Sequence, residues 1–313
     1  MTDAVRFRAA APQDLAASAQ VFSDSIAAYV TRLNQPWFAG DVAPLVRLLG
    51  HFLATDPERF VVATVAADPE RVVGFGSATV RGGTWFLGML FVLPEFQGAG
   101  VGRALLERIL PTPDARAAGT LALATATDSL QPISTALYST YGMVPRLPVY
   151  YFVGRPERTD HLPRLPNGIR VSEHWADERA ESAIAGDLAR IDTATLGAAH
   201  PQDHDFLRSE GRRRFLYRSA VGDLAGYGYI APSGRIGPIA AHDARLLAPI
   251  GIHLIESVSP PGAYATWITG AADELFMTLL RAGFRFESFP TLLLWNRPFA
   301  DFARYVPSNL ALL

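Results

Sequence analysis

The order of hydrophobic and polar residues divides the first half of the chain into strands and amphipathic helices. Residues 60–66 and 72–81 are rich in β-branched side chains, which is typical of strands. Residues 85–93 form a third apolar run that ends before a proline. Residues 15–33 and 44–53 repeat apolar side chains at helical spacing. The pattern therefore predicts strands and helices that follow one another along the chain.

The run from Leu87 to Leu106 is the most informative stretch, because an apolar strand pattern passes directly into a helical one. Gly98, Gly100 and Gly102 stand at that point. The first N–H groups of a helix have no partner inside it, and the helix dipole makes that end electropositive, so a pyrophosphate can bind there. Arg103 can add a charge-assisted contact. A tight strand-to-helix turn without any ligand would have the same spacing and stays open as an alternative.

This stretch resembles motif A of the GCN5-related N-acetyltransferases, the GNAT superfamily. The family pattern is a strand, a Val-x-Pro turn and Gln/Arg-x-x-Gly-x-Gly/Ala, and Gln97, Gly100 and Gly102 match it. In the family the loop binds the pyrophosphate of acetyl-CoA, and the strand before it pairs with the pantetheine arm. The resemblance therefore implies a cofactor site on Leu90, Phe91, Val92, Gln97, Gly98, Ala99, Gly100, Val101, Gly102 and Arg103.

A second stretch, residues 131–143, resembles a later helix of the same family. Ser134, Leu137, Tyr138 and Gly142 match the family pattern. The resemblance implies that Ser134 contacts the cofactor and that Tyr138 protonates the sulfur of coenzyme A as it leaves. A phenol suits this role, since it is neutral at pH 7 and donates a hydrogen bond. The alternative is that Tyr138 is only a packing aromatic.

The chain also departs from the family. Many relatives carry a glutamate late in the motif A strand as the general base, whereas this chain has Gly88, Met89 and Leu90 there. The base must then be another carboxylate or a chain of waters; the candidates are Asp24, Glu58, Asp128 and the carboxylate of the C-terminus. Acceptor-site candidates between the first two helices are Trp37, Phe38 and His51, with core packing as their alternative role.

The second half repeats the first in a weaker form. Residues 156–167 have the proline-rich composition of a linker, which predicts a first domain at 1–155 and a second at 168–313. In the second domain no glycine loop follows residue 241, and Leu279 and Leu280 stand where Leu137 and Tyr138 stand in the first. Residues 286–295, with Pro290 inside, resemble residues 146–152 with Pro148 in the first half. The resemblance implies an α/β fold with a mixed sheet, in which two GNAT domains stand in tandem and the degenerate second domain binds no acetyl-CoA.

Composition excludes several classes of function. A net charge of −2 argues against nucleic acid or a membrane as the main partner. The absence of cysteine excludes a thiolate nucleophile and cysteine-ligated metals. His200 and His204 are four residues apart, but with Pro201 between them and no third ligand evident, no metal site is predicted. Arg212, Arg213 and Arg214 are expected on a solvated face. The polar N-terminus predicts a cytoplasmic protein.

The sequence thus predicts an N-acetyltransferase that passes acetyl directly from acetyl-CoA to an amine of a small molecule or peptide. The alternative is a protein that binds or senses acyl-CoA without turnover, and a third reading is the transfer of a longer acyl group. The identity of the acceptor and the presence of a homodimer are left open by the sequence.

Overall fold

The computed structural model describes residues 4–36, 40–157, 161–174 and 178–313. The chain forms two compact units, one made of residues 1–80 and 85–121, the other of residues 81–84 and 122–313. Trp37 and Phe38 lie outside the described residues. Among the described residues, no helix combines the length and the apolar character that crossing a membrane requires.

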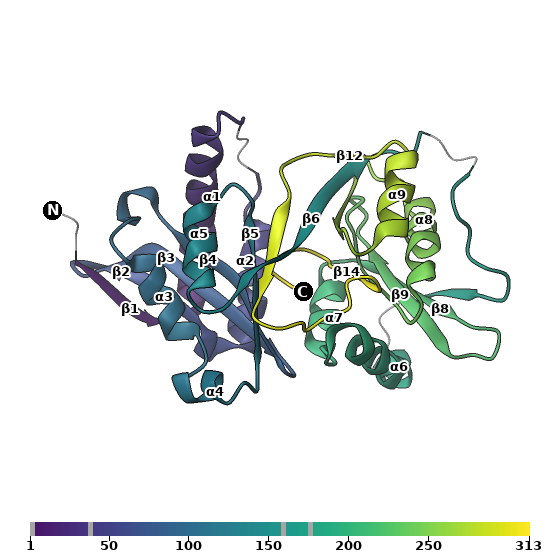
Figure 1. Cartoon of the computed structure of the whole chain (residues 1–313), viewed down its shortest axis with the longest axis horizontal. Helices are drawn as coiled ribbons and strands as arrows, with labels where there is room; N and C mark the ends of the chain where they lie inside the picture. The colour runs from purple at the N-terminus through teal and green to yellow at the C-terminus, as the bar shows by residue number, and fades with distance from the viewer. Residues whose placement is uncertain (1–3, 37–39, 158–160, 175–177) are drawn as a thin grey trace. The chain divides into compact units, whose positions relative to one another are not determined.

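The first unit is a sheet with helices packed on it (Figure 1). Its strands β1 (Val5–Ala9), β2 (Phe60–Val65), β3 (Asp68–Arg81) and β4 (Thr84–Val92) are neighbours in that order, and β2 runs antiparallel to both β1 and β3. Every residue of β2 is buried, as expected for a strand covered on both faces. The helices are α1 (Leu15–Arg32), α2 (Ala43–Thr55), α3 (Val101–Ile109) and α4 (Pro113–Ala117).

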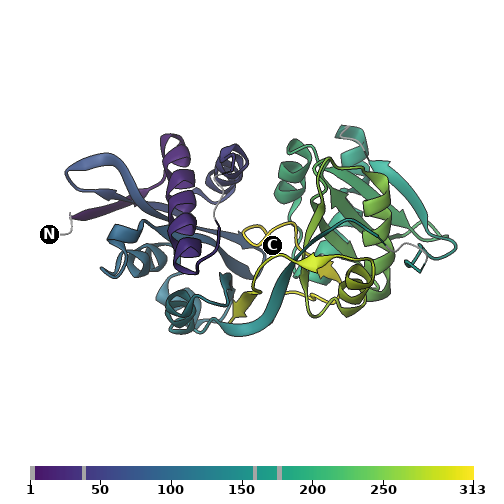
Figure 2. The same cartoon turned by 90° about the horizontal axis from the view of Figure 1, so that it is seen from above.

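Helix α1 is fixed against the end of β4. Figure 2 shows α1, in purple, beside the strands of its unit. The hydroxyl of Ser25 donates to the carbonyl oxygen of Val92 over 3.0 Å, and the rings of Phe22 and Phe91 meet edge to face at 4.7 Å. The last residues of β4 therefore have a defined position before the chain turns into α3.

The second unit contains two groups of strands. In one, β5 (Ala122–Asp128), β13 (Thr291–Trp295), β6 (Val144–Gly154) and β11 (Tyr264–Thr269) are neighbours in that order, and β12 (Arg285–Phe286) also pairs with β6. The other group, in spatial order, is β14 (Tyr305–Val306), β10 (Ile236–Ala241), β9 (Leu224–Ile230), β8 (Arg213–Arg218) and β7 (Arg170–His174). The helices are α5 (Pro132–Ser139), α6 (Glu178–Leu196), α7 (Pro201–Ser209), α8 (Leu247–Ser257) and α9 (Asp273–Arg281).

Strand β13 lies between β5 and β6 and is antiparallel to both (Figure 1, yellow beside teal). Leu293 pairs with Ala126 on one side and with Leu147 on the other. A strand from the end of the chain thus completes a sheet begun by residues 122–154. This pairing explains why the contacts place residues 122–155 in the second unit, whereas the linker composition predicted a first domain up to residue 155.

Residues 286–295 contain the end of β12 at Phe286 and all of β13, which begins at Thr291 directly after Pro290, a residue with no N–H to donate to a ladder. One expectation about the second half is wrong, because the arginine run is not on a solvated face. Arg214 is fully buried, because it lies in β8 and forms ion pairs and hydrogen bonds with Glu181 of α6 and Tyr229 of β9.

The core of the second unit packs α8 closely against β9. A Cβ atom added at Gly226 would lie 2.9 Å from Ile250, and one added at Gly228 would lie 2.8 Å from Leu254. A larger residue at either position would force these side chains of α8 to move, and at Gly226 it would also meet the carbonyl oxygen of Ala240 at 2.9 Å. Both glycines lie in β9, on either side of Tyr227.

Candidate functional site

The loop between β4 and α3 has the backbone that its glycines predicted. Gly98 has a φ of +79° and Gly100 a φ of +82°, in the left-handed region that other residues rarely enter. Gly100 is the N-cap of α3. No atom lies within 4 Å of the Cβ position of either glycine, so the space beside the loop is open.

The first turn of α3 is free of side-chain caps among the described residues. Its first N–H groups point out of the helix end, where the dipole favours an anion. Gln97 fixes the loop to the strand, since its Nε2 donates to the carbonyl oxygen of Val92 over 2.7 Å. Val101 is buried and anchors the helix, while Arg103 is exposed two residues later. This arrangement is suited to holding a phosphate group.

The predicted cofactor residues are divided between the two units. Ten of them are in the first unit, in two segments joined by one turn: Leu90, Phe91, Val92, and Gln97, Gly98, Ala99, Gly100, Val101, Gly102, Arg103. Phe91 is held in place by the rings of Phe22 and Phe75. Ser134 and the predicted acid Tyr138 belong to the second unit.

Tyr138 lies on α5 and is only 5% exposed. Burial raises the pKa of its phenol above the ordinary value, so the side chain stays protonated at neutral pH. Ser134 ties the same helix to β5, because its Oγ lies 2.6 Å from the Oγ1 of Thr127. The Ser134 hydroxyl also donates to the carbonyl oxygen of Gln131 over 3.2 Å. Helix α5 therefore presents a neutral phenol on a firmly held backbone.

The structure gives each general-base candidate its own surroundings. Asp24 is exposed on α1 and accepts a hydrogen bond from Gln20. Glu58 is 62% exposed and pairs with Arg59. Asp128 uses Oδ1 to accept the N–H of Leu130 at 2.8 Å. Each carboxylate already has a partner of its own, and the geometry favours none of the three as the base.

The second unit has a matching turn between β10 and α8, with a different cap. A short 3₁₀ helix (Ala244–Leu246) leads into α8, and the carboxylate of Asp243 accepts the backbone N–H of Arg245 at 3.0 Å. The guanidinium of Arg245 then pairs with the same carboxylate at 2.6 Å. The turn before α8 therefore carries a carboxylate of the protein itself, bonded to one backbone N–H of the 3₁₀ helix.

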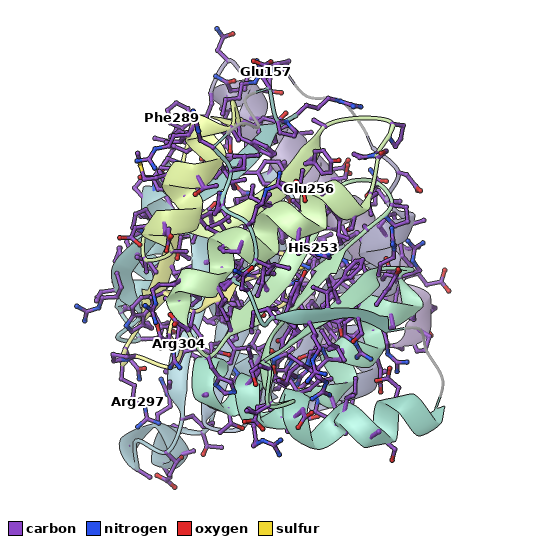
Figure 3. The ribbon with its side chains drawn as sticks, turned by 90° about the vertical axis from the view of Figure 1, so that its right-hand side faces the viewer. Glu157, His253, Glu256, Phe289, Arg297 and Arg304 are labelled. Carbon is purple, nitrogen blue, oxygen red and sulfur yellow. The ribbon has the colours of Figure 1, made fainter. Side chains whose placement is uncertain are left out.

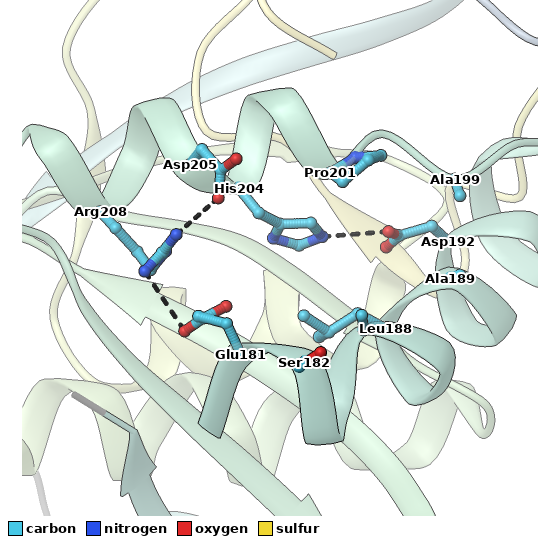
Figure 4. Close-up of a pocket in the computed structure, with 11 residues that line it drawn as sticks. Glu181, Ser182, Leu188, Ala189, Asp192, Ala199, Pro201, His204, Asp205 and Arg208 are labelled. Atoms are coloured by element: carbon cyan, nitrogen blue, oxygen red, sulfur yellow. Dashed lines mark hydrogen bonds and ion pairs between the residues drawn. The ribbon is translucent and has the colours of Figure 1, made fainter. Parts of the chain in front are cut away.

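A cavity of about 580 Å³ between α6 and α7 was not predicted from the sequence (Figure 4). It reaches Asp192 of α6 and His204 of α7, and none of its lining residues belongs to the predicted site. His204 Nε2 lies 3.0 Å from Asp192 Oδ2, and the hydroxyl of Tyr227 donates to Asp192 Oδ1 over 2.8 Å. Only the spacing of His200 and His204 hinted at this cluster, because Asp192 is on another helix.

A family model matches the part of the chain that contains both sequence motifs. Residues 26–143 match the family model described as the acetyltransferase (GNAT) family. A search of curated protein sequences gave no significant match.

Solved structures share the fold over nearly the whole chain. A putative acetyltransferase from Pyrococcus horikoshii superposes with a TM-score of 0.74 at 16% identity, covering 99% of this chain and 96% of its own. A GCN5-related N-acetyltransferase from Sphaerobacter thermophilus gives 0.61 at 16% identity, with 96% and 98% covered. A tandem GNAT protein from the clavulanic acid biosynthesis pathway gives 0.56 at 16% identity, with 94% and 99% covered. The chain has the fold of tandem GNAT proteins, and its residues 26–143 match the model of the GNAT acetyltransferase family.

Proposed function

We propose that this protein is an N-acetyltransferase that transfers the acetyl group of acetyl-CoA directly to an amine. The observation that carries the proposal is the turn at Gly98 and Gly100, which leaves the N-terminus of α3 open and uncapped. An open helix N-terminus reached through glycines is a binding site for the pyrophosphate of a nucleotide cofactor. The match of residues 26–143 to the acetyltransferase family supports acetyl-CoA as that cofactor.

In the proposed reaction the amine attacks the thioester carbonyl, the bond to sulfur breaks, and coenzyme A leaves as its thiol. Tyr138 supplies the proton to the sulfur, a role that fits a buried phenol whose pKa is raised by burial. The chain has no cysteine to form a thioester intermediate, which favours direct transfer. The base is a water chain or one of the exposed carboxylates.

The test is release of free coenzyme A from acetyl-CoA across a panel of amines and peptides with free amino groups. We expect at least one acceptor to raise release well above hydrolysis in its absence. Initial rates with both substrates varied should give intersecting lines in double-reciprocal plots. Parallel lines would show a covalent acetyl-enzyme and would overturn direct transfer.

A second candidate, an acyl-CoA-binding or sensing protein, is favoured by one observation. Strand β4 carries Gly88, Met89 and Leu90 where relatives have a basic carboxylate. The same assay separates the two: a sensor binds acetyl-CoA in calorimetry and releases no coenzyme A with any amine of the panel. Calorimetry with longer acyl-CoA thioesters in the same series measures the acyl-chain preference.

A further inference from the structure

A buried polar cluster in the second unit has no part in the proposed acetyl transfer. It consists of Asp192 near the end of α6, and of His200 and His204 at the start of α7. All three side chains are at most 3% exposed. One ligand atom from each lies within 4.8 Å of the others. A carboxylate and two imidazoles can all bind a cation, and the three lie buried together with no cationic side chain among them. Burying such polar groups is costly, so the arrangement requires a physical reason.

His200 is the member of the cluster whose hydrogen-bonding groups are least satisfied. His200 is only 3% exposed, and neither of its ring nitrogens has a hydrogen-bond partner among the described residues. The nearest acceptors are Asp192 Oδ1, 3.6 Å from Nε2, and Asp203 Oδ2, 3.7 Å from Nδ1. An imidazole that is buried without partners loses its hydrogen bonds to water and gains none in the protein, which costs free energy. Its Nε2 points toward the same carboxylate that His204 contacts.

We propose that Asp192, His200 and His204 form a binding site for a divalent transition-metal ion of the zinc class. Two imidazoles and one carboxylate are the donor set that zinc takes when three protein ligands leave a fourth position to water. Calcium and magnesium prefer oxygen ligands and are not expected here.

The distances fit a tetrahedral ion. With ligand bonds of about 2.1 Å, neighbouring ligand atoms of a tetrahedral site lie about 3.4 Å apart. Oδ2 of Asp192 is 3.0 Å from Nε2 of His204, and Oδ1 of Asp192 is 3.6 Å from Nε2 of His200, on either side of that value. One ligand atom from each of the three residues lies within 4.8 Å of the others, so an ion among them would draw the side chains closer together.

The groups behind the ligands have the arrangement that metal sites use to orient them. His204 places its second nitrogen, Nδ1, 2.8 Å from the hydroxyl of Tyr229. His200 turns its Nδ1 toward Asp203, and Arg81 holds that carboxylate through two hydrogen bonds of 2.9 Å. The contact with Tyr229 orients the imidazole of His204 with its Nε2 toward Asp192, whereas Asp203 lies near Nδ1 of His200 without a hydrogen bond to it.

The carboxylate ligand is oriented in the same way, and the site is accessible. Tyr227 donates to Asp192 Oδ1, which leaves the second oxygen for the ion. The cavity between α6 and α7 reaches Asp192 and His204 (Figure 4), so it offers an entry path and room for a water ligand. Since the ligands come from both helices, the ion would join the end of α6 to the start of α7.

The experiment uses the whole chain without a polyhistidine tag, freed of metal by dialysis against a chelator. We expect one zinc ion per chain by elemental analysis after reloading, and visible absorption bands of tetrahedral cobalt when Co²⁺ is added instead. Zinc should also raise the melting temperature of the apo protein, because it binds the folded state. Loading of the wild type no higher than that of the His200→Asn variant overturns the proposal.

Two variants and a matched control locate the site. His200→Asn and Asp192→Asn each remove one ligand at similar volume and should weaken zinc binding by about 10-fold or more. The control is His253→Asn, since His253 is a half-buried histidine of the same unit, on α8 beside Glu256 (Figure 3), with Tyr217 as its partner at 2.9 Å. Unchanged zinc affinity in both ligand variants would mean adventitious binding and would refute the site. If either variant fails to fold, the wild-type stoichiometry and cobalt spectrum decide.

Discussion

The two strand-to-helix turns of this protein stand at comparable places in its two halves and treat the helix N-terminus in opposite ways. Between β4 and α3, Gly98 and Gly100 adopt left-handed conformations and no described side chain caps the helix. Between β10 and α8, the carboxylate of Asp243 accepts the N–H of Arg245 in the short 3₁₀ helix that leads into α8. The first turn has no side-chain cap among the described residues, and the second has a carboxylate of the protein beside it. The comparison teaches that two similar strand-to-helix connections can differ in whether a side chain of the protein itself bonds the exposed N–H groups.

The variant Gly100→Glu tests the open turn most severely. A left-handed φ costs a non-glycine residue about 1 kcal/mol or more, and the new carboxylate would repel the phosphates, so we expect about a 100-fold loss of acetyl-CoA affinity in calorimetry. Gly119→Glu is the matched control, because Gly119 also has a positive φ, of +64°, and open space at its Cβ position. Equal losses in both variants would trace the effect to strain rather than to the phosphate site.

The two halves also differ at the helix that carries Tyr138 in the first motif-bearing half, because the corresponding helix α9 has Leu279 and Leu280 there. The variant Tyr138→Phe tests this difference. Loss of a general acid should lower kcat about 100-fold and leave the Kd for acetyl-CoA nearly unchanged. Tyr141→Phe, three residues further along, should keep the wild-type kcat. A Tyr138→Phe enzyme with full kcat would assign this side chain to packing alone.

A smaller effect is expected for Arg103→Ala on the exposed side of α3. One charge-assisted contact to a phosphate contributes about 1 kcal/mol at such a site, so the affinity for acetyl-CoA should fall about 5-fold, and less at high salt. Arg108→Ala removes an arginine from the last turn of the same helix and serves as the control. If both variants lose affinity equally, the net charge of the helix matters rather than the position of Arg103.

The smallest effect is expected for Asp243→Ala at the closed turn. Loss of the cap should lower the free energy of unfolding by about 1 kcal/mol, without creating a second acetyl-CoA site. The hydrogen bond from Arg245 lowers the pKa of Asp243, so the cap stabilises the fold above the ordinary carboxyl pKa and is lost as the pH falls through the lowered one. The wild type and the variant should therefore converge in stability in acid. A second mole of acetyl-CoA bound by the variant would show that Asp243 alone closes the turn.

The sequence predicted the features that depend on neighbours along the chain. The loop at Gly98 and Gly100 is local, since residue type alone determines which positions accept a positive φ, and the same holds for the self-contained helix around Tyr138. The fold class and the tandem arrangement followed from the resemblance and are confirmed by the comparisons.

Features that depend on distant partners could not be predicted. The arginine run looked like a solvated face because the partners of Arg214 lie on α6 and β9, far away in sequence. The prediction of no metal site rested on two histidines, since nothing in the sequence places Asp192 beside them.

The place of β13 between β5 and β6 has a consequence for how the protein is made. A ribosome releases residues 122–154 long before residues 291–295, so β5 and β6 emerge with hydrogen-bonding edges that lack their native neighbour. Unpaired edges of this kind are sites of aggregation. The sheet that contains β5 and β6 is therefore complete only after β13 has been translated, and a chain truncated near residue 155 should aggregate through these edges.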